Sequence, residues 1–344
     1  MTSPQTLVPE IRFEGFSSAW NRCSVGDVAS VLGGNAWKSS EYADDGDYLV
    51  VTIANVSGDV YIDDTIGNHI SCESPNGYLL HGEDILVSLT GDVGRVSKMS
   101  NTRGLLNQRV GKVIPNQSKI TPDYLFHVLR NPIFEKAMIE AGQGAAQKNI
   151  SNKDILAYSL AAPSEVKEQI DVANFLNSID CLINLYQRKY DRLKNVKKSM
   201  LEKMFPRDGA NVPEIRFAGF TDAWEQRKFS DFAQRESTFR ESSSEYPSVE
   251  YEDVVAEEGR LNKDVRQKEV QKTGIVFDGS QVLYGKLRPY LHNWLSPDFT
   301  GVAVGDWWVL RPVGVDKKFL YRLIQTQQFD EVANQSSGSK MPRA

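Results

Sequence analysis

The feature that most constrains this chain is a motif that occurs twice. It reads VPEIRFEGFSSAW from Val8 to Trp20 and VPEIRFAGFTDAW from Val212 to Trp224, 204 residues further on. Solenoid repeats have periods of roughly 20 to 50 residues, so this spacing is that of two whole domains. The chain is therefore predicted to contain two similar domains, each introduced by a copy of this segment, which we call the opening motif.

The composition fits two globular domains. The chain has 344 residues, of which 40% are apolar and 25% charged, and a single core stops growing at roughly 250 to 300 residues. No apolar run approaches the roughly 18 to 20 residues that cross a bilayer, and the start of the chain lacks the features of a signal peptide. The three cysteines, Cys23, Cys72 and Cys181, predict neither a disulfide framework nor a zinc site. We therefore expect a cytoplasmic protein without membrane contact.

Each half places strand signals before helix signals. Short β-branched runs such as Tyr48–Ile53 and Asp84–Leu89 are separated by turn residues, and Thr121-Pro122 then predicts a helix capped by Thr121. The second half repeats this order, with Gly279–Tyr284 where the first half has Gly82–Val87. The matched positions are those of a scaffold, while the residues between them differ. This pattern predicts one fold that carries two different surfaces.

A long helix is predicted between the two domains. Ser164 is a good N-cap, and Pro206 and Gly209 end the segment, so we expect a helix over residues 164–207. Its apolar residues recur at alternating spacings of three and four, as in a coiled-coil seam that needs a partner helix. The predicted helix-pairing residues are Leu176, Ile179, Ile183, Tyr186, Tyr190, Leu193 and Met200. No second helix of this kind follows the second domain before Ala344, so a second copy of the chain is one expected partner.

These features together resemble the specificity subunit of type I restriction-modification enzymes. The resemblance rests on the paired opening motifs, the strand that ends at Gly91-Asp92-Val93-Gly94, the triplet Asn149-Ile150-Ser151, and the helix segments Glu168-Gln169-Ile170 and Lys203-Met204-Phe205-Pro206. It covers essentially the whole chain, except that the family's C-terminal conserved helix is lacking.

The resemblance implies an α+β fold with two similar target-recognition domains, residues 1–163 and 208–344, joined by the long coiled-coil-type helix. Each domain would recognise one half of a bipartite site in double-stranded DNA, and the helix would set their spacing and bind modification (methyltransferase) subunits. Restriction (translocase and endonuclease) subunits would join that complex. This chain would have no cofactor of its own, with S-adenosylmethionine, ATP and magnesium acting in the partner subunits.

Candidate catalytic motifs are weak. Asn131-Pro132-Ile133-Phe134 differs from the Asn/Asp-Pro-Pro-Tyr/Phe motif of amino-methyltransferases and is better explained as a proline bend between two helical pieces. Pro122-Asp123 with Glu165-Val166-Lys167 would be a nuclease motif only if both parts lay on adjacent strands, and both are predicted at helix starts. The four histidines show no metal-binding spacing. We predict no catalytic or metal-binding residues in this chain.

The candidate DNA-binding residues are basic and polar side chains on predicted loops, interleaved with aromatic ones. Lys and Arg neutralise phosphates, and Arg and Gln pair with base edges in the major groove. Arg288 precedes Pro289 and Arg343 follows Pro342, so both stand in stiffened backbone. In the first domain the candidates are Lys38, Arg95, Lys98, Arg103, Gln108, Arg109 and Lys148, and in the second Arg260, Lys263, Arg266, Lys286, Arg288, Tyr290, His292, Lys340 and Arg343.

Two other functions stay open at this point. One is a self-contained DNA methyltransferase or nuclease, which requires a methyl-donor loop or metal-binding carboxylates. The other is an adaptor, or a truncated relative of the specificity subunit, that only binds partner subunits. Sequence-dependent binding to DNA that weakens steeply with salt would distinguish a DNA reader from such an adaptor.

Overall fold

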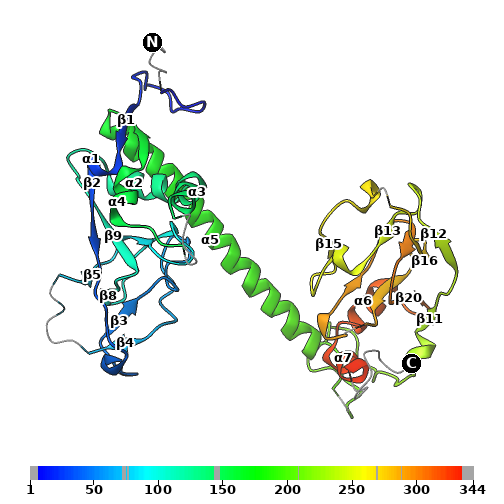
Figure 1. Cartoon of the computed structure of the whole chain (residues 1–344). Helices are drawn as coiled ribbons and strands as arrows, with labels where there is room; N and C mark the ends of the chain where they lie inside the picture. The colour runs from blue at the N-terminus through cyan, green and yellow to red at the C-terminus, as the bar shows by residue number, and fades with distance from the viewer. Residues whose placement is uncertain are drawn as a thin grey trace. The chain divides into compact units, whose positions relative to one another are not determined.

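A computed structural model describes residues 7–71, 75, 77–142, 148–207, 209–268, 270–287 and 289–334. The chain divides into two compact units, residues 1–187 and residues 188–344, which we call unit 1 and unit 2. Both contain strands and helices, and one long helix, α5 (Val166–Lys203), contributes residues to each (Figure 1). The mixed helix and strand composition expected from the sequence is confirmed.

Unit 1 contains two four-stranded sheets. The first has the order β2-β9-β6-β7 and is antiparallel throughout; the second has the order β4-β3-β8-β5, with β3 and β8 parallel. The strands of the first sheet are β2 (Ala29–Gly33), β6 (Ile85–Ser88), β7 (Val96–Lys98) and β9 (Val110–Pro115). Those of the second are β3 (Tyr48–Val51), β4 (His69–Ile70), β5 (Leu79–Leu80) and β8 (Gly104–Leu106), and β1 (Asn21–Ser24) pairs separately with β10 (Ser159–Ala162).

The alternation of side chains along β6 explains the layers of unit 1. Successive residues of a strand point to opposite faces. Ile85 and Val87 belong to a core that includes Phe126 and Phe134 from the helices, whereas Leu86 belongs to a second core shared with the other sheet. All residues of β6 are buried, because this strand lies between helices on one face and a sheet on the other.

Unit 2 repeats this plan. Its first sheet has the order β11-β20-β17-β18, which is that of unit 1 strand for strand, and Val282↔Leu310 pairs β17 with β20 as Ile85↔Val113 pairs β6 with β9. Along β17, Val282 and Tyr284 again face the helices while Leu283 faces the second sheet. The strands are β11 (Ala233–Arg235), β17 (Val282–Gly285), β18 (Trp294–Leu295) and β20 (Trp307–Pro312).

The second sheets differ at one edge. In unit 2 the order is β12-β16-β19-β13, so three strands match β5, β8 and β3, but the fourth strand, β12, pairs beside β16 rather than at the opposite edge. These strands are β12 (Phe239–Glu241), β13 (Ser248–Val249), β16 (Thr273–Phe277) and β19 (Gly301–Ala303), and a separate hairpin joins β14 (Val254–Val255) and β15 (Arg260–Leu261). The two units therefore share a scaffold and differ at a sheet edge.

Short helices close one face of each first sheet. Pro122 and Pro132 start two of them, and Asn131 caps the second by accepting a hydrogen bond from Ile133 N–H (2.9 Å). Thr121 is the N-cap residue of the first, as expected, but its hydroxyl makes no capping hydrogen bond, and its N–H donates to Gln169 of α5 (2.9 Å). The α-helices besides α5 are α1 (Val25–Val28), α2 (Pro122–Leu129), α3 (Pro132–Ala141), α4 (Asn152–Ala157), α6 (Lys317–Leu323) and α7 (Gln327–Asn334).

The apolar face predicted on α5 is exposed. Ile183 is 60% exposed, Tyr186 65% and Leu193 58%, while Tyr190 donates its hydroxyl to Glu258 (3.1 Å). Leu176 is half-buried, and Ile179 and Met200 are less exposed than the residues above. The helix is shorter than the expected 164–207, and pairing with another helix stays a prediction.

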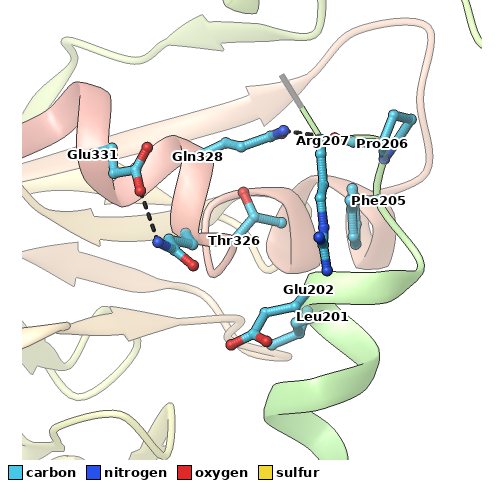
Figure 2. Close-up of a pocket in the computed structure, with 9 residues that line it drawn as sticks. Leu201, Glu202, Phe205, Pro206, Arg207, Thr326, Gln328 and Glu331 are labelled. Atoms are coloured by element: carbon cyan, nitrogen blue, oxygen red, sulfur yellow. Dashed lines mark hydrogen bonds between the residues drawn. The ribbon is translucent and has the colours of Figure 1, made fainter. Parts of the chain in front are cut away.

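In unit 2, α7 lies against the end of α5. Gln328 donates a hydrogen bond from its amide to the carbonyl oxygen of Pro206 (2.6 Å), and Figure 2 shows this contact beside a cavity of about 230 Å³. One turn apart on α7, the Gln327 amide donates a hydrogen bond to the Glu331 carboxylate (2.7 Å). These contacts use polar side chains of α7.

Candidate nucleic-acid interface

One end of the first sheet of unit 1 gathers several of the predicted residues. The loop after β2 approaches the loop before β9 so closely that a Cβ on Gly34 would lie 2.3 Å from the carbonyl oxygen of Asn107. Only glycine allows this approach. The adjacent Asn35 and Gln108 are joined by a backbone hydrogen bond of 2.9 Å, and the Asn107 side chain accepts one from Arg109 N–H (3.1 Å).

Lys148 reaches the same place from a distant part of the chain. Its carbonyl oxygen accepts a hydrogen bond from Gly91 N–H (3.0 Å), and Leu89 N–H donates to the carbonyl oxygen of Arg109 (2.9 Å). The loop after β6 is thus held between Lys148 and Arg109. Lys38 follows Trp37, whose indole N–H donates to the carbonyl oxygen of Leu106 (3.1 Å) at the same end of β8.

We call Lys38, Gln108, Arg109 and Lys148 the loop cluster. All four side chains are exposed. Within the residues that the structure describes, none of the three basic ones forms an ion pair. Three cations that no carboxylate neutralises, on turns held by backbone hydrogen bonds, form a surface suited to the phosphates of a nucleic acid.

The other predicted residues of unit 1 lie apart from the loop cluster. Arg95 pairs with Asp92 (2.9 Å) and approaches Glu135 (4.0 Å), so its charge is balanced within the protein. Arg103 precedes β8, at the strand end opposite to Gln108, where it stacks on the Tyr48 ring at 4.4 Å and donates to the Tyr48 hydroxyl (2.7 Å). Stacking fixes the plane of this guanidinium, and the residue is exposed at the other end of β8 from Gln108.

The expectation that Lys98 is a surface contact is wrong. Lys98 is 4% exposed, and its Nζ lies 2.6 Å from Asp123 and 2.8 Å from Glu83. Burial lowers the pKa of Lys98, but the hydrogen bonds that its ammonium donates to Asp123 and Glu83 outweigh it, so the pKa is raised and the ammonium stays charged. Lys98 therefore connects β7 to α2 in the interior of unit 1.

In unit 2 several predicted residues are paired within the protein. Lys286 lies 3.4 Å from Asp306, and Arg260 lies 2.5 Å from Glu258. Lys263 lies 2.9 Å from Asp253, and His292 lies 3.1 Å from Asp330. Tyr290 is 62% exposed, on the short turn η5 (Pro289–Leu291). Arg288, Lys340 and Arg343 lie outside the described residues.

Sequence reasoning missed two arginines of unit 2. Arg235 lies over the Trp308 ring (5.0 Å) and Arg240 over the Tyr246 ring (3.8 Å), both on exposed strand positions. Neither forms an ion pair among the described residues. Both lie on strands rather than on predicted loops, and Arg235 and Trp308 are brought together only by the pairing of β11 with β20.

The candidate catalytic motifs have structural partners. Asn131 caps α3, Asp123 binds Lys98, and Glu165 accepts a hydrogen bond from the Ser18 hydroxyl (3.3 Å). In the described part of the chain, no group of three or more His, Cys, Asp or Glu side chains could hold a metal ion. The same residues include no helix long and apolar enough to span a bilayer.

The sequence matches one protein family over more than half its length. The family model described as "Type I restriction modification DNA specificity domain" matches residues 17–195. The type I restriction enzyme EcoBI specificity subunit of Escherichia coli is 24% identical over 181 residues, or 52% of this chain and 36% of the relative. The MjaVIII specificity subunit of Methanocaldococcus jannaschii is 25% identical over 191 residues, or 53% of this chain and 44% of the relative.

The fold is similar to that of a solved S subunit. The crystal structure of a type I restriction-modification system S subunit from M. genitalium matches 93% of this chain and 80% of its own, with a TM-score of 0.55 and 12% sequence identity. The chain spans less than half the length of the two curated relatives above, and the matched residues include the loop cluster and most of α5. The chain therefore belongs to the type I restriction-modification DNA specificity family.

Proposed function

We propose that the chain is the DNA-binding specificity subunit of a type I restriction-modification enzyme, in which each unit recognises one half of a bipartite site. The observation that carries this proposal is the loop cluster, whose three unpaired cations and Gln108 lie on fixed turns in a domain of this family. Unpaired cations bind phosphates, and Gln108 is suited to an adenine edge. The distinct sheet edge of unit 2, with Arg235 and Arg240, supports a second and different recognition surface.

The proposal assigns no catalysis to this chain. Modification and restriction subunits would supply methyl transfer and cleavage, with S-adenosylmethionine, ATP and magnesium bound there. The exposed apolar face of α5 supports a role as spacer and docking surface for modification subunits, or for α5 of a second copy. Some of these side chains, such as Tyr190 and Tyr186, are 45 to 65% exposed. Covering their apolar surface with a partner lowers the free energy and so favours binding.

A duplex selection experiment tests DNA recognition. Purified chain, alone and with modification subunits, is incubated with a library of random duplexes, and bound DNA is sequenced over several rounds. We expect enrichment of two short conserved elements separated by a fixed unread spacer. The triple variant Lys38→Ala, Arg109→Ala, Lys148→Ala should lose one element, whereas Arg22→Ala, an exposed arginine of β1 outside the loop cluster, should enrich both.

The result that would contradict the proposal is binding without any enriched sequence, in the presence of modification subunits as well. Such binding would favour the adaptor. A self-contained methyltransferase is tested by incubating the purified chain alone with DNA and radiolabelled S-adenosylmethionine. Label transferred to DNA by the chain alone would overturn the assignment of catalysis to partner subunits.

A further inference from the structure

The turn before β20 in unit 2 corresponds to the turn before β9 in unit 1. In unit 1 the carbonyl oxygen of Arg109 accepts a hydrogen bond from Leu89 N–H (2.9 Å), at the end of β6. In unit 2 the carbonyl oxygen of Asp306 accepts one from Lys286 N–H (3.0 Å), at the end of β17. The registers of β6 with β9 and of β17 with β20 give the same alignment. Asp306 therefore stands at the position that Arg109 has in the loop cluster.

The backbone at Asp306 is held in place by its neighbours. Gly305 has a φ of +99°, a left-handed conformation that favours glycine, so the chain turns just before Asp306. The Asp306 carbonyl oxygen also accepts a hydrogen bond from the Tyr251 hydroxyl, which itself accepts one from Leu287 N–H (3.1 Å). Tyr251 thus joins the turn after β17 to the turn before β20. Because these bonds use the carbonyl of Asp306, a substitution of its side chain leaves them in place.

The exchange of arginine for aspartate reverses the charge at this position. The Asp306 side chain is 37% exposed, and its carboxylate lies 3.4 Å from Nζ of Lys286, whose side chain is 24% exposed. A carboxylate repels phosphates, and a lysine that it neutralises adds little to phosphate binding. Where such a pair faces DNA, the groups that it can bind are therefore the donors and acceptors on base edges.

The major-groove edge of a G·C pair offers both partners that an ammonium and a carboxylate require. Guanine has two acceptors, N7 and O6, and cytosine has an amino donor at N4. An A·T pair reverses the two central groups, so the ammonium would meet the adenine amino group and the carboxylate would meet thymine O4. A T·A pair restores that order but places the thymine methyl group beside the ammonium and adenine N7 beside the carboxylate. Only G·C, in one orientation, satisfies both groups.

We propose that Asp306 is a specificity-determining residue of unit 2 and that, together with Lys286, it reads one G·C base pair in the major groove. The assignment rests on the proposed function, because it places DNA at the same turn in both units. At this turn unit 1 presents Gln108 and Arg109, whereas unit 2 presents a carboxylate beside an ammonium. The two units therefore read different bases from equivalent turns of one scaffold.

The test is duplex selection with the full chain and modification subunits, followed by anisotropy on selected duplexes. The wild type should enrich a G·C pair at one position of the element that survives in the triple variant of the loop cluster. Asp306→Asn should shift that position toward A·T, because an asparagine amide pairs with adenine N6 and N7. By anisotropy the wild type should prefer G·C over A·T there at least about tenfold, and Asp306→Ala less than about threefold.

The sign of the affinity change separates base reading from other roles. Because Asp306→Ala removes a negative charge from a surface that faces phosphates, binding to an unrelated duplex should stay the same or become tighter. Lys286→Ala should relax preference at the same base pair. Weaker binding of Asp306→Ala to every duplex with the preference intact, or relaxation of different base pairs by the two variants, would overturn the proposal.

Asp298→Asn is the matched control, since Asp298 is an exposed carboxylate that precedes β19, at the other end of that strand from Asp306. It should keep the wild-type preference, and an equal change would overturn the proposal by indicating a general effect of charge. If the wild type enriches no element, the proposed function fails and this assignment with it. If it enriches two elements but no G·C pair responds to Asp306→Asn, this assignment alone fails.

Discussion

The hydrogen bonds that Arg12 and Trp20 donate to the Glu168 carboxylate allow a quantitative prediction for the stability of unit 1. The side chain is 1% exposed and accepts three hydrogen bonds, two from Arg12 and one from Trp20. A hydrogen bond to a charged group contributes about 1.5–3 kcal/mol, and the glutamine of Glu168→Gln can keep one acceptor while it leaves Arg12 without a counter-charge. We expect Glu168→Gln to lower the free energy of unfolding of unit 1 by about 2–3 kcal/mol at pH 7.

The pH dependence follows from the sign of the shift. Hydrogen bonds from Arg12, more than any other cause, hold the pKa of Glu168 below its ordinary value. A lowered folded-state pKa stabilises fully above the unfolded-state pKa of about 4.3, and the stabilisation is lost as the pH falls through the folded-state value. The difference between the wild type and Glu168→Gln should therefore be complete at pH 7 and shrink below about pH 4.

Hydrogen exchange during urea titration measures this effect in the correct unit, because two units need not unfold together. Peptides from residues 7–142 report on unit 1, and those from residues 209–334 serve as an internal reference. Glu165→Gln is the matched control, since Glu165 is exposed and its carboxylate accepts, among the described residues, a hydrogen bond from the Ser18 hydroxyl alone (3.3 Å). A loss below about 0.5 kcal/mol, or an equal loss at pH 7 and pH 3, would refute the reasoning.

Three further predictions concern other parts of the molecule. Arg109→Ala should weaken DNA binding and reduce the slope of log affinity against log salt by about 0.9, measured by anisotropy at several salt concentrations; an unchanged slope would mean that Arg109 does not contact a phosphate. Phe134→Ala should destabilise unit 1 by about 3–5 kcal/mol, because the ring is fully buried and packs on Tyr158 at 4.9 Å. Phe329→Ala, at the half-buried equivalent position, should lower the stability of unit 2 by less. Equal losses in urea unfolding would contradict the burial argument. Ile183→Asp should abolish assembly with modification subunits on size exclusion without changing the circular dichroism of the chain, since Ile183 is 60% exposed; intact assembly would exclude this face of α5 as the docking surface.

The shared scaffold of the two units could be predicted from the sequence. Repeated opening motifs predicted two similar units, and the apolar residues that face the helices recur at matching positions, Ile85 and Val87 in unit 1 and Val282 and Tyr284 in unit 2. Proline and Asn131 marked where α2 ends and α3 begins. These features are local, because a few neighbouring residues decide periodicity, capping and turns.

The residues of the candidate nucleic-acid interface could be predicted from the sequence only in part. Gln108 and Arg109 were predicted as contacts from their residue type, but that they lie beside Lys148 depends on backbone hydrogen bonds around Gly91 and Leu89. Arg95 and Lys286 were predicted in the same way, yet each has a carboxylate partner within the fold. Whether a basic side chain is free for DNA thus depends on which acidic residue the fold brings beside it.

By itself the sequence determined the duplication, the α+β class, the long helix and the family. Only the tertiary structure decided which charges are paired: it buries Lys98 between Asp123 and Glu83, binds Arg12 to Glu168, and leaves Nη1 of Arg216, in the second copy of the motif, without an acceptor among the described residues. The physical reason is that a charge interacts through space, so its partner can lie 156 positions away, as Glu168 does from Arg12. Two similar motifs can therefore make different contacts, because those contacts depend on residues far away in the sequence.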